Sequence, residues 1–388
     1  MKKGIKIALA VLMIASVMSL GLIGCAKEAA TPPEAPPEPE AVEPIVLTFA
    51  HFTALDSAEQ TRIYAPWAHR IETETDGRIE IEFVLTDSLF SILDVWPALR
   101  MGIVDITLVA PSLSPGAFKL WWAIGLPGMG WPSVEAMDAI TWQLYEEFPE
   151  FAAELDPVHP LIVYSELMIL FTKEEVKTVE DMEGLKLSFY SELSEQFFSN
   201  LGAVPTYVVN YEAPLAGQQG ILDGLGHSWA PYSGMRYGEA FPYALNVDVG
   251  STILMYAMNN DTWDSLGTVI QDQLTGTIEG YDASRFWGRY LFDLAYEGIL
   301  DQIDQGIFPA DFVKGVYTPP PAEMARFAEI GAGPIYDALV PGLDAEGYPA
   351  TAFYNRAIEL ISEWDLPPTP AWPEHPDWPY PADAFYLE

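Results

Sequence analysis

From Ile45 onward, short apolar runs alternate with longer amphipathic runs along the chain. Short runs rich in β-branched residues are typical of strands, and apolar residues spaced by three or four are typical of helices. The predicted strands are Ile45–Ala50, Ile79–Val84, Ile103–Val109, Leu161–Thr172, Leu185–Tyr190, Thr206–Val209, Gly226–Ala230 and Ile253–Met258. The predicted helices are Ser57–Thr75, Ile92–Met101, Val134–Phe148, Glu192–Leu201, Ala213–Leu222, Trp263–Ile278, Ala283–Gln305, Pro321–Leu339 and Ala350–Trp364. This alternation favours an α/β architecture with largely parallel sheets.

The length of this patterned region predicts two lobes. About 340 residues follow position 44, which is more than one hydrophobic core usually supports. We expect 45–165 to form mainly lobe 1, 166–260 mainly lobe 2, and 261–364 to add helices that complete both. Residues 365–388, rich in Pro and Trp, predict an extended strap. Ligand sites in α/β sheets lie at the carboxyl ends of strands, so the loops there would face each other across a cleft between the lobes.

The N-terminus has the pattern of a secretory leader. Three lysines among the first six residues precede the apolar run 7–23, which ends at Gly24-Cys25. This resembles the bacterial lipobox, and implies a signal peptide over 1–24 and a lipidated Cys25; the alternative is an uncleaved anchor. Residues 25–44 are rich in Pro and Glu and predict a tether. Either alternative places the rest of the chain outside the cytoplasm, in the periplasm or on the outer face of the cytoplasmic membrane.

Composition and charge exclude several classes of function. Apolar residues make up 50% of the chain and charged residues 19%, which is typical of a folded protein. The formal net charge of −38 becomes about 41 negative without the leader lysines, and this argues against nucleic-acid binding. Cys25 is the only cysteine, so the sequence offers no disulfide framework, thiol nucleophile or cysteine-rich metal site.

The sequence contains no motif that would identify an enzyme. The five histidines are scattered without zinc-ligand spacing, and no nucleophile elbow or phosphate-binding loop occurs. The 56 acidic residues allow too many chance pairings for one glycosidase pair to be singled out. We therefore expect no catalysis, cofactor or metal, and a lipid-anchored hydrolase stays open only as an alternative.

One block of the sequence is more specific. It runs from Val179 through Gly184-Leu185-Lys186-Leu187, continues with Leu201-Gly202-Ala203-Val204-Pro205, and ends with Tyr211-Glu212-Ala213-Pro214-Leu215, Gln219-Gly220 and Leu222-Asp223-Gly224. This block resembles the solute receptors of tripartite ATP-independent periplasmic (TRAP) transporters, the dicarboxylate-receptor (DctP-like) family. Weaker matches occur in the same order at 75–79, 102–106, 126–128 and 260–266.

The resemblance implies a two-lobed periplasmic-binding-protein-like fold and a receptor function. Such a receptor binds a small organic solute in the cleft, closes, and delivers it to membrane permease subunits driven by an ion gradient, without ATP. Family membership alone suggests an organic acid. A receptor-like sensor or scaffold that has no permease is a further alternative.

The sequence departs from the family where the ligand carboxylate is held. The family arginine that follows "Leu-Lys-apolar" corresponds to Ser188, and a second family arginine falls near Leu167 or Met168. A serine hydroxyl cannot replace a bidentate guanidinium. The nearest candidate cations are Arg236 in lobe 2 and Arg62 in lobe 1. The departure points to an uncharged, aromatic or otherwise atypical solute.

The other candidate ligand-binding residues lie near the ends of predicted strands or just after them. His227 corresponds to the family's polar pocket position, and a core residue with satisfied hydrogen bonds is the equally weighted alternative. Aromatic side chains stand near it or near Ser188, and weaker candidates follow strands of lobe 1. The complete set is Ser188, Tyr190, His227, Trp229, Tyr232, Arg236, His51, Phe52 and Ser112.

Overall fold

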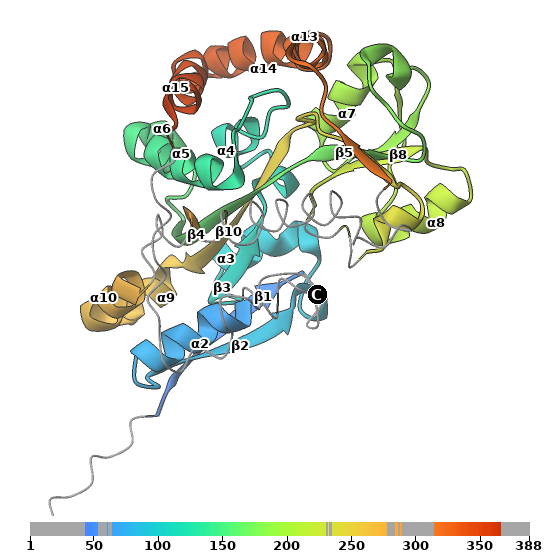
Figure 1. The fold of residues 1–388 in the computed structure, drawn as a ribbon. Coiled ribbons are helices and arrows are strands. Elements are labelled where there is room, and N and C mark those ends of the chain that lie inside the picture. Colours follow the sequence, from blue (N-terminus) through green and yellow to red (C-terminus); the bar gives the residue numbers. More distant parts are fainter. Residues whose placement is uncertain are drawn as a thin grey trace, which may run out of the picture. The chain divides into compact units, whose positions relative to one another are not determined.

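The computed structural model describes residues 43–52, 60, 64–229, 232, 235–277, 284–285, 288 and 314–365 (Figure 1). Cys25, the leader, nearly all of the tether and Arg62 lie outside these residues. So do most of the predicted helix Ala283–Gln305 and all of the predicted strap beyond Asp365. The described residues from Pro44 onward belong to one compact unit by their internal contacts.

The first sheet has five strands in the order β2-β1-β3-β10-β4. Their bounds are β1 (Ile45–His51), β2 (Ile79–Leu85), β3 (Ile106–Val109), β4 (Val158–Leu167) and β10 (Ser251–Asn259). β1 pairs in parallel with β2 and β3, whereas β10 is antiparallel to both β3 and β4. The β-branched and aromatic residues of these strands give the buried face that the sequence pattern predicts.

The second sheet has six strands in the order β11-β9-β5-β8-β6-β7. Their bounds are β5 (Ile169–Thr172), β6 (Lys186–Ser188), β7 (Val204–Pro205), β8 (Gly224–His227), β9 (Tyr243–Leu245) and β11 (Gly315–Tyr317). β5 is antiparallel to β8 and β9, and the other neighbours are parallel.

The expectation of largely parallel sheets is wrong, because both sheets are mixed. The reason is that the chain passes between the sheets more than once. Leu161–Thr172 is not one strand but two, β4 and β5, which belong to different sheets and are separated by Met168. The chain then returns through β9 into β10, and this return makes β10 antiparallel to its neighbours in the first sheet.

Three short strands also differ from the prediction. Thr206–Val209 is not a strand, and the pairing residues of that region are Val204–Pro205. β9 and β11 were not predicted, because three-residue strands give too few alternations to be recognised.

Most of the predicted helices are present in the described part of the chain. Their bounds are α2 (Ala65–Glu74), α3 (Val95–Arg100), α4 (Leu120–Ala123), α5 (Val134–Glu147), α6 (Pro149–Ala153), α7 (Glu192–Asn200), α8 (Ala213–Gln218), α9 (Asn260–Ser265), α10 (Gly267–Thr277), α13 (Pro321–Phe327), α14 (Gly333–Glu346) and α15 (Ala350–Glu363). However, α4 and α6 were not predicted, the predicted helix Trp263–Ile278 is divided into α9 and α10, and the predicted helix Pro321–Leu339 is divided into α13 and α14 and extends to Glu346. Short 3₁₀ helices occupy Thr86–Ser88, Ile92–Asp94, Pro111–Leu113, Val179–Met182, Asn210–Glu212 and Tyr237–Glu239. Ser133 and Ser191 cap α5 and α7 by accepting backbone N–H donors, as serine at this position usually does.

The C-terminal helices connect elements that lie beside different sheets. α14 contacts α7, which follows strand β6 of the second sheet, and α15 contacts α5, which precedes strand β4 of the first (Figure 1). A π-helical turn at Ala328–Ala332 separates α13 from α14, and the Asn200 side chain donates to the Gly331 carbonyl there at 2.8 Å. Among the described residues, no helix is both long enough and apolar enough to cross a bilayer.

Candidate functional site

The two sheets meet where two chain segments pass between them side by side. Met168, between β4 and β5, donates its backbone N–H to the Gly250 carbonyl at 2.9 Å and accepts from the Val249 N–H at 3.1 Å. Ser251, the first residue of β10, donates its backbone N–H to the Gly125 carbonyl at 3.2 Å. These backbone hydrogen bonds hold the two crossing segments together and fix Gly125 beside them.

Polar side chains from both sheets gather beside this crossing. Glu166 lies near the end of β4, and its Oε2 accepts a 2.5 Å hydrogen bond from the hydroxyl of Ser228, which follows β8. Tyr190 follows β6, and its hydroxyl donates to the Ser251 carbonyl at 3.4 Å. We call Glu166, Tyr190, Ser228 and Ser251 the junction cluster. The Glu166–Ser228 and Tyr190–Ser251 hydrogen bonds each join a strand of the first sheet to a residue that follows a strand of the second.

The Tyr190 phenol lies in a negative environment. Burial raises its pKa well above the usual value, and the charges of Asp248 and Glu166 raise it further. Burial also raises the pKa of Tyr237, and Glu166 adds to that effect. Glu166 therefore lies close enough to several phenols to act on them electrostatically, and all of these phenols stay neutral at physiological pH.

A group of buried aromatic rings lies along the first sheet near Glu166. The Tyr64 and Tyr164 hydroxyl oxygens are 3.3 Å apart, and both rings pack near Tyr256. Burial is the main cause of the strongly raised pKa of Tyr164, to which the neighbouring phenols and Glu166 contribute. His51, at the end of β1, is fully buried with its ring centroid 4.9 Å from that of Tyr64. Phe52 is partly buried against the same core.

A small cavity is bordered by residues next to both sheets. Its lining includes Ser112 after β3, Ser191 at the start of α7, and Ser251. Its volume is about 10 Å³, which is room for about one water molecule. The Ser251 hydroxyl is buried there without a hydrogen-bond partner. The described residues are therefore packed closely at this point, and a larger solute would need the sheets to separate.

Two predicted site residues lie in the second sheet with their polar atoms satisfied. The Ser188 hydroxyl donates to the Val208 carbonyl at 3.2 Å. His227 Nδ1 accepts from the Ser228 backbone N–H at 2.8 Å, and its Nε2 is 3.0 Å from the Asn210 amide. Because Nδ1 accepts, the neutral ring carries its proton on Nε2; this N–H can donate to Asn210 only when the amide is turned so that Oδ1, and not Nδ2, faces the ring. Burial lowers the pKa of His227 to about 4, in agreement with a neutral imidazole.

Three other predicted residues do not join the junction cluster. Trp229 and Tyr232 pack with Phe171 in an apolar core of the second sheet, and the Tyr232 hydroxyl donates to the Phe241 carbonyl at 3.2 Å. Arg236 has a left-handed backbone conformation, is 68% exposed, and forms an ion pair with Glu239. Cys25 and Arg62 lie outside the described residues.

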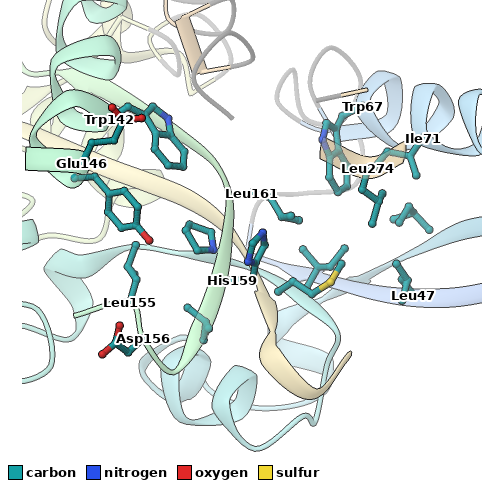
Figure 2. A pocket seen from close by; sticks show the side chains of 16 residues that line it. Leu47, Trp67, Ile71, Trp142, Glu146, Leu155, Asp156, His159, Leu161 and Leu274 are labelled. Atoms are coloured by element: carbon teal, nitrogen blue, oxygen red, sulfur yellow. The ribbon is translucent and has the colours of Figure 1, made fainter. Parts of the chain in front are cut away.

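A second, larger cavity lies over the first sheet (Figure 2). Its volume is about 480 Å³. Trp142 and Glu146 of α5 stand on one side of it and Trp67 and Ile71 of α2 on the other, with His159 between them. The His159 ring stacks on Trp263 at 3.7 Å, and burial lowers its pKa. All of the described lining residues come from the first sheet and its adjoining helices, so closure of one sheet toward the other would not enclose this space.

Two functional candidates were missed by sequence reasoning. Glu166 directly precedes Leu167 and Met168, the positions to which the resemblance assigns a second arginine. The side chain from this region that belongs to the junction cluster is the carboxylate of Glu166. Asp248 accepts backbone N–H donors from Gly130 at 3.2 Å and Gly250 at 2.9 Å, and burial raises its pKa to about 6. No sequence signal distinguishes either residue among 56 acidic side chains. The described residues contain no group of three or more side chains able to hold a metal ion.

Residues 49–285 match the model of the DctP family, described as "Bacterial extracellular solute-binding protein, family 7". The match spans more than half of the chain and contains both sheets up to β10 together with the junction cluster. The chain belongs to this family. The resemblance to dicarboxylate receptors is thereby confirmed at the level of the family, which consists of extracellular binding proteins and not of enzymes.

A relative of known sequence and several solved structures agree with this family. A solute-binding protein of Roseobacter denitrificans is 23% identical over 222 residues, which cover 56% of this chain and 68% of the relative. A TRAP periplasmic solute-binding protein from Desulfovibrio salexigens superposes with a TM-score of 0.72 at 20% identity, covering 83% of this chain and 97% of its own.

Two further structures contain aromatic acids. A TRAP solute-binding protein from Rhodoferax ferrireducens, in complex with copurified benzoate, has a TM-score of 0.71 at 20% identity and covers 82% of this chain and 98% of its own. A marine metagenome protein specific for aromatic acid ligands, in complex with 3-hydroxybenzoate, has a TM-score of 0.72 at 21% identity and covers 84% of this chain and 100% of its own. At these identities the likeness confirms the two-sheet α/β fold of this family 7 protein with its C-terminal helices.

Proposed function

We propose that this family 7 protein is the extracytoplasmic receptor of a TRAP-type secondary transporter. It binds one small organic solute between its two sheets and delivers it, chemically unchanged, to the membrane permease. The observation that carries this proposal is the junction cluster, because its hydroxyls and carboxylate lie where the sheets meet and where the chain crosses twice between them. A binding site at such a crossing couples solute contact to closure.

The junction supports a solute other than the simple dicarboxylates that the family name suggests. The position that the resemblance assigns to a carboxylate-binding arginine is Ser188, whose hydroxyl is engaged with a backbone carbonyl. Tyrosine rings and hydroxyl groups surround the junction instead. We infer a solute with an aromatic ring or another apolar body and few negative charges. The aromatic acids bound by structural neighbours make an aromatic body the first to test.

A thermal-shift screen of residues 44–388 tests the receptor proposal. The panel would include acids, amides, sugars, amines and aromatic alcohols. A solute present at one hundred times its dissociation constant stabilises the folded state by about 2.7 kcal/mol. With an unfolding entropy of about 2 cal/mol/K per residue, this corresponds to a shift of about 4 °C. Chromatography after incubation should recover the solute unchanged. Conversion of a panel compound by the purified protein would contradict the proposal.

We further propose that Cys25 is acylated and that residues 25–44 tether the receptor to the membrane. One acyl chain alone holds a protein weakly, so firm retention requires the several chains of a bacterial lipoprotein. The full chain expressed in a bacterium should fractionate with membranes, and Cys25→Ser should appear in the soluble extracytoplasmic fraction. Membrane retention of Cys25→Ser with an intact leader would instead indicate an uncleaved anchor.

A further inference from the structure

The larger cavity, which lies over the first sheet (Figure 2), is distant from the junction cluster along the strands. Four strands each contribute one apolar residue to its floor: Leu47 of β1, Ile81 of β2, Ile106 of β3 and Met258 of β10. The first three stand in the first half of their parallel strands, and Met258 is the last residue but one of antiparallel β10. Ser251 of the junction cluster is the first residue of β10. The cavity and the junction therefore lie toward opposite ends of the first sheet.

The apolar lining of this cavity suits an organic ligand. The four floor residues are each no more than 7% exposed, so they have little contact with bulk solvent. Aromatic side chains stand on the walls, namely Trp67 of α2 together with Trp142 and Tyr145 of α5. The volume of about 480 Å³ falls within the range of roughly 300–1,000 Å³ that is typical of small-molecule pockets. Such a space favours a ring or another compact hydrocarbon body.

One hydrogen-bond donor in this lining lacks an acceptor. Trp67 is fully buried, and its indole Nε1 has no hydrogen-bond partner in the described part of the chain. The other indole of the lining differs, because Trp142 Nε1 donates to the Ser284 hydroxyl at 2.7 Å. Buried polar groups in folded proteins are nearly always paired, and an indole N–H can be paired only by an acceptor. A ligand that presents an oxygen acceptor to Trp67 would complete this pairing.

The polar groups of the lining argue against a charged ligand. Glu146 and Asp156 are exposed carboxylates, and the described lining residues include no lysine or arginine. The His159 ring stacks on Trp263, and burial lowers its pKa, so the ring stays neutral at physiological pH. An acid would therefore meet like charges without a compensating cation. A cation would lose its hydration against the apolar floor.

We propose that this cavity is a second binding site, which takes an uncharged organic molecule with an apolar ring and one hydrogen-bond acceptor. The acceptor, a ketone or ether oxygen, binds the Nε1–H of Trp67, and the ring packs against the apolar floor. The site is independent of the proposed receptor function, because the junction between the sheets is formed by other residues.

Filling the cavity locates the site. Leu161 borders the cavity and is half-buried (Figure 2), so Leu161→Trp places a larger side chain in this space. We would measure binding of the neutral ketone 2-acetylnaphthalene to residues 44–388 by equilibrium dialysis. Leu161→Trp should weaken this binding about 10-fold or more while the circular dichroism spectrum stays that of the wild type, and Leu161→Phe replaces it if the larger substitution does not fold. No ketone binding by the wild type, or equal binding by the folded variant, would overturn the second site and leave the receptor function standing.

Matched ligands separate the acceptor from shape and charge. The hydrocarbon 2-isopropenylnaphthalene and the acid 2-naphthoate have the same number of non-hydrogen atoms as the ketone. The first has no oxygen acceptor, and the second is an anion. In the binding that Leu161→Trp abolishes, we expect the ketone to bind about 5-fold or more tightly than the hydrocarbon, and about 10-fold or more tightly than the acid. A smaller preference in either comparison would contradict the proposed ligand class.

Substitution of Trp67 tests the assigned donor. Trp67→Phe keeps an aromatic ring but removes Nε1, so it should reduce the preference for the ketone over the hydrocarbon to less than about 2-fold. This ratio is the readout, because a change in packing affects both ligands alike. The matched control is Trp131→Phe, since Trp131 is also buried with an Nε1 that has no partner in the described chain but is not among the described residues that line the cavity. A preference that Trp67→Phe leaves unchanged, or that Trp131→Phe reduces equally, would overturn the role of Trp67.

Discussion

Gly250 lies at the crossing between the sheets, and its substitution by alanine tests whether the crossing is built as the structure shows. Its φ of +119° is a conformation that residues with a side chain rarely adopt. A Cβ at this position would overlap the Tyr190 hydroxyl and would lie 3.1 Å from the Gly125 carbonyl oxygen. Alanine therefore strains the backbone and displaces a member of the junction cluster at once.

The expected cost follows from these two effects. A residue held in a sparsely populated backbone region costs about 1–3 kcal/mol. Displacing Tyr190 from the Ser251 carbonyl loses a hydrogen bond worth about 0.5–1.5 kcal/mol. Together they predict that Gly250→Ala lowers the free energy of unfolding by about 2–4 kcal/mol, or the melting temperature by about 3–6 °C for a unit of this length.

Circular dichroism melts of residues 44–388 would measure this loss, with two companion variants. Tyr190→Phe removes the overlapping hydroxyl and its hydrogen bond, so Gly250→Ala should cost about 1 kcal/mol less in the Tyr190→Phe background than in the wild type, because only the backbone strain remains. Gly116→Ala is the matched control, because Gly116 has open space around its Cβ position and no left-handed φ. Its stability should be unchanged or slightly raised. A Gly250→Ala protein that melts within 1 °C of the wild type would refute the described geometry of the crossing.

Two buried titrating groups predict opposite pH dependences. The pKa of Asp248 is raised to about 6, so the folded state binds its proton more tightly than the unfolded state does. Relative to Asp248→Asn, the free energy of unfolding of the wild type should therefore fall by up to about 3 kcal/mol as the pH rises from 4 to 7. Denaturant melts at several pH values measure this difference, and a wild type that gains stability over that range would reverse the assignment. The pKa of His227 is lowered to about 4, so the stability that the neutral ring contributes is present above pH 6.5 and is lost as the pH falls. Relative to His227→Gln, the free energy of unfolding of the wild type should fall by up to about 3 kcal/mol between pH 7 and pH 4. Nitrogen NMR of the imidazole should show the neutral form protonated on Nε2 at pH 6, and a charged ring at that pH would contradict the buried environment.

Much of the fold was predictable because its longer helices and strands repeat a regular pattern of apolar and polar residues. α5 and α15 lie within one residue of their predicted bounds, and β1 and β2 extend their predicted strands by one residue each. The mixed order of the strands was not predictable from local pattern, because the direction of β10 depends on where the chain crosses between sheets. Met168 marks that crossing, but it continues an apolar run and gives no local signal of a break.

The candidate site was predicted only in part. Tyr190 and Ser112 follow strands as expected and border the junction between the sheets. Trp229 and Tyr232 also follow a strand, yet they pack into an apolar core, because sequence position alone does not say toward which side of the sheet a side chain turns. Glu166 could not be predicted, because nothing in the sequence distinguishes it among 56 acidic residues. Its role depends on Ser228 and on phenols that come from distant parts of the sequence.

Native mass spectrometry of residues 44–388 with a mixture of small acids, alcohols and amines tests the receptor function most directly. If the protein binds one solute between its two sheets and leaves it chemically unchanged, the spectrum will show one ligand per chain. The ligand released on denaturation will then have its original mass. Release of a compound with a changed mass, or absence of any one-to-one complex, would contradict the account.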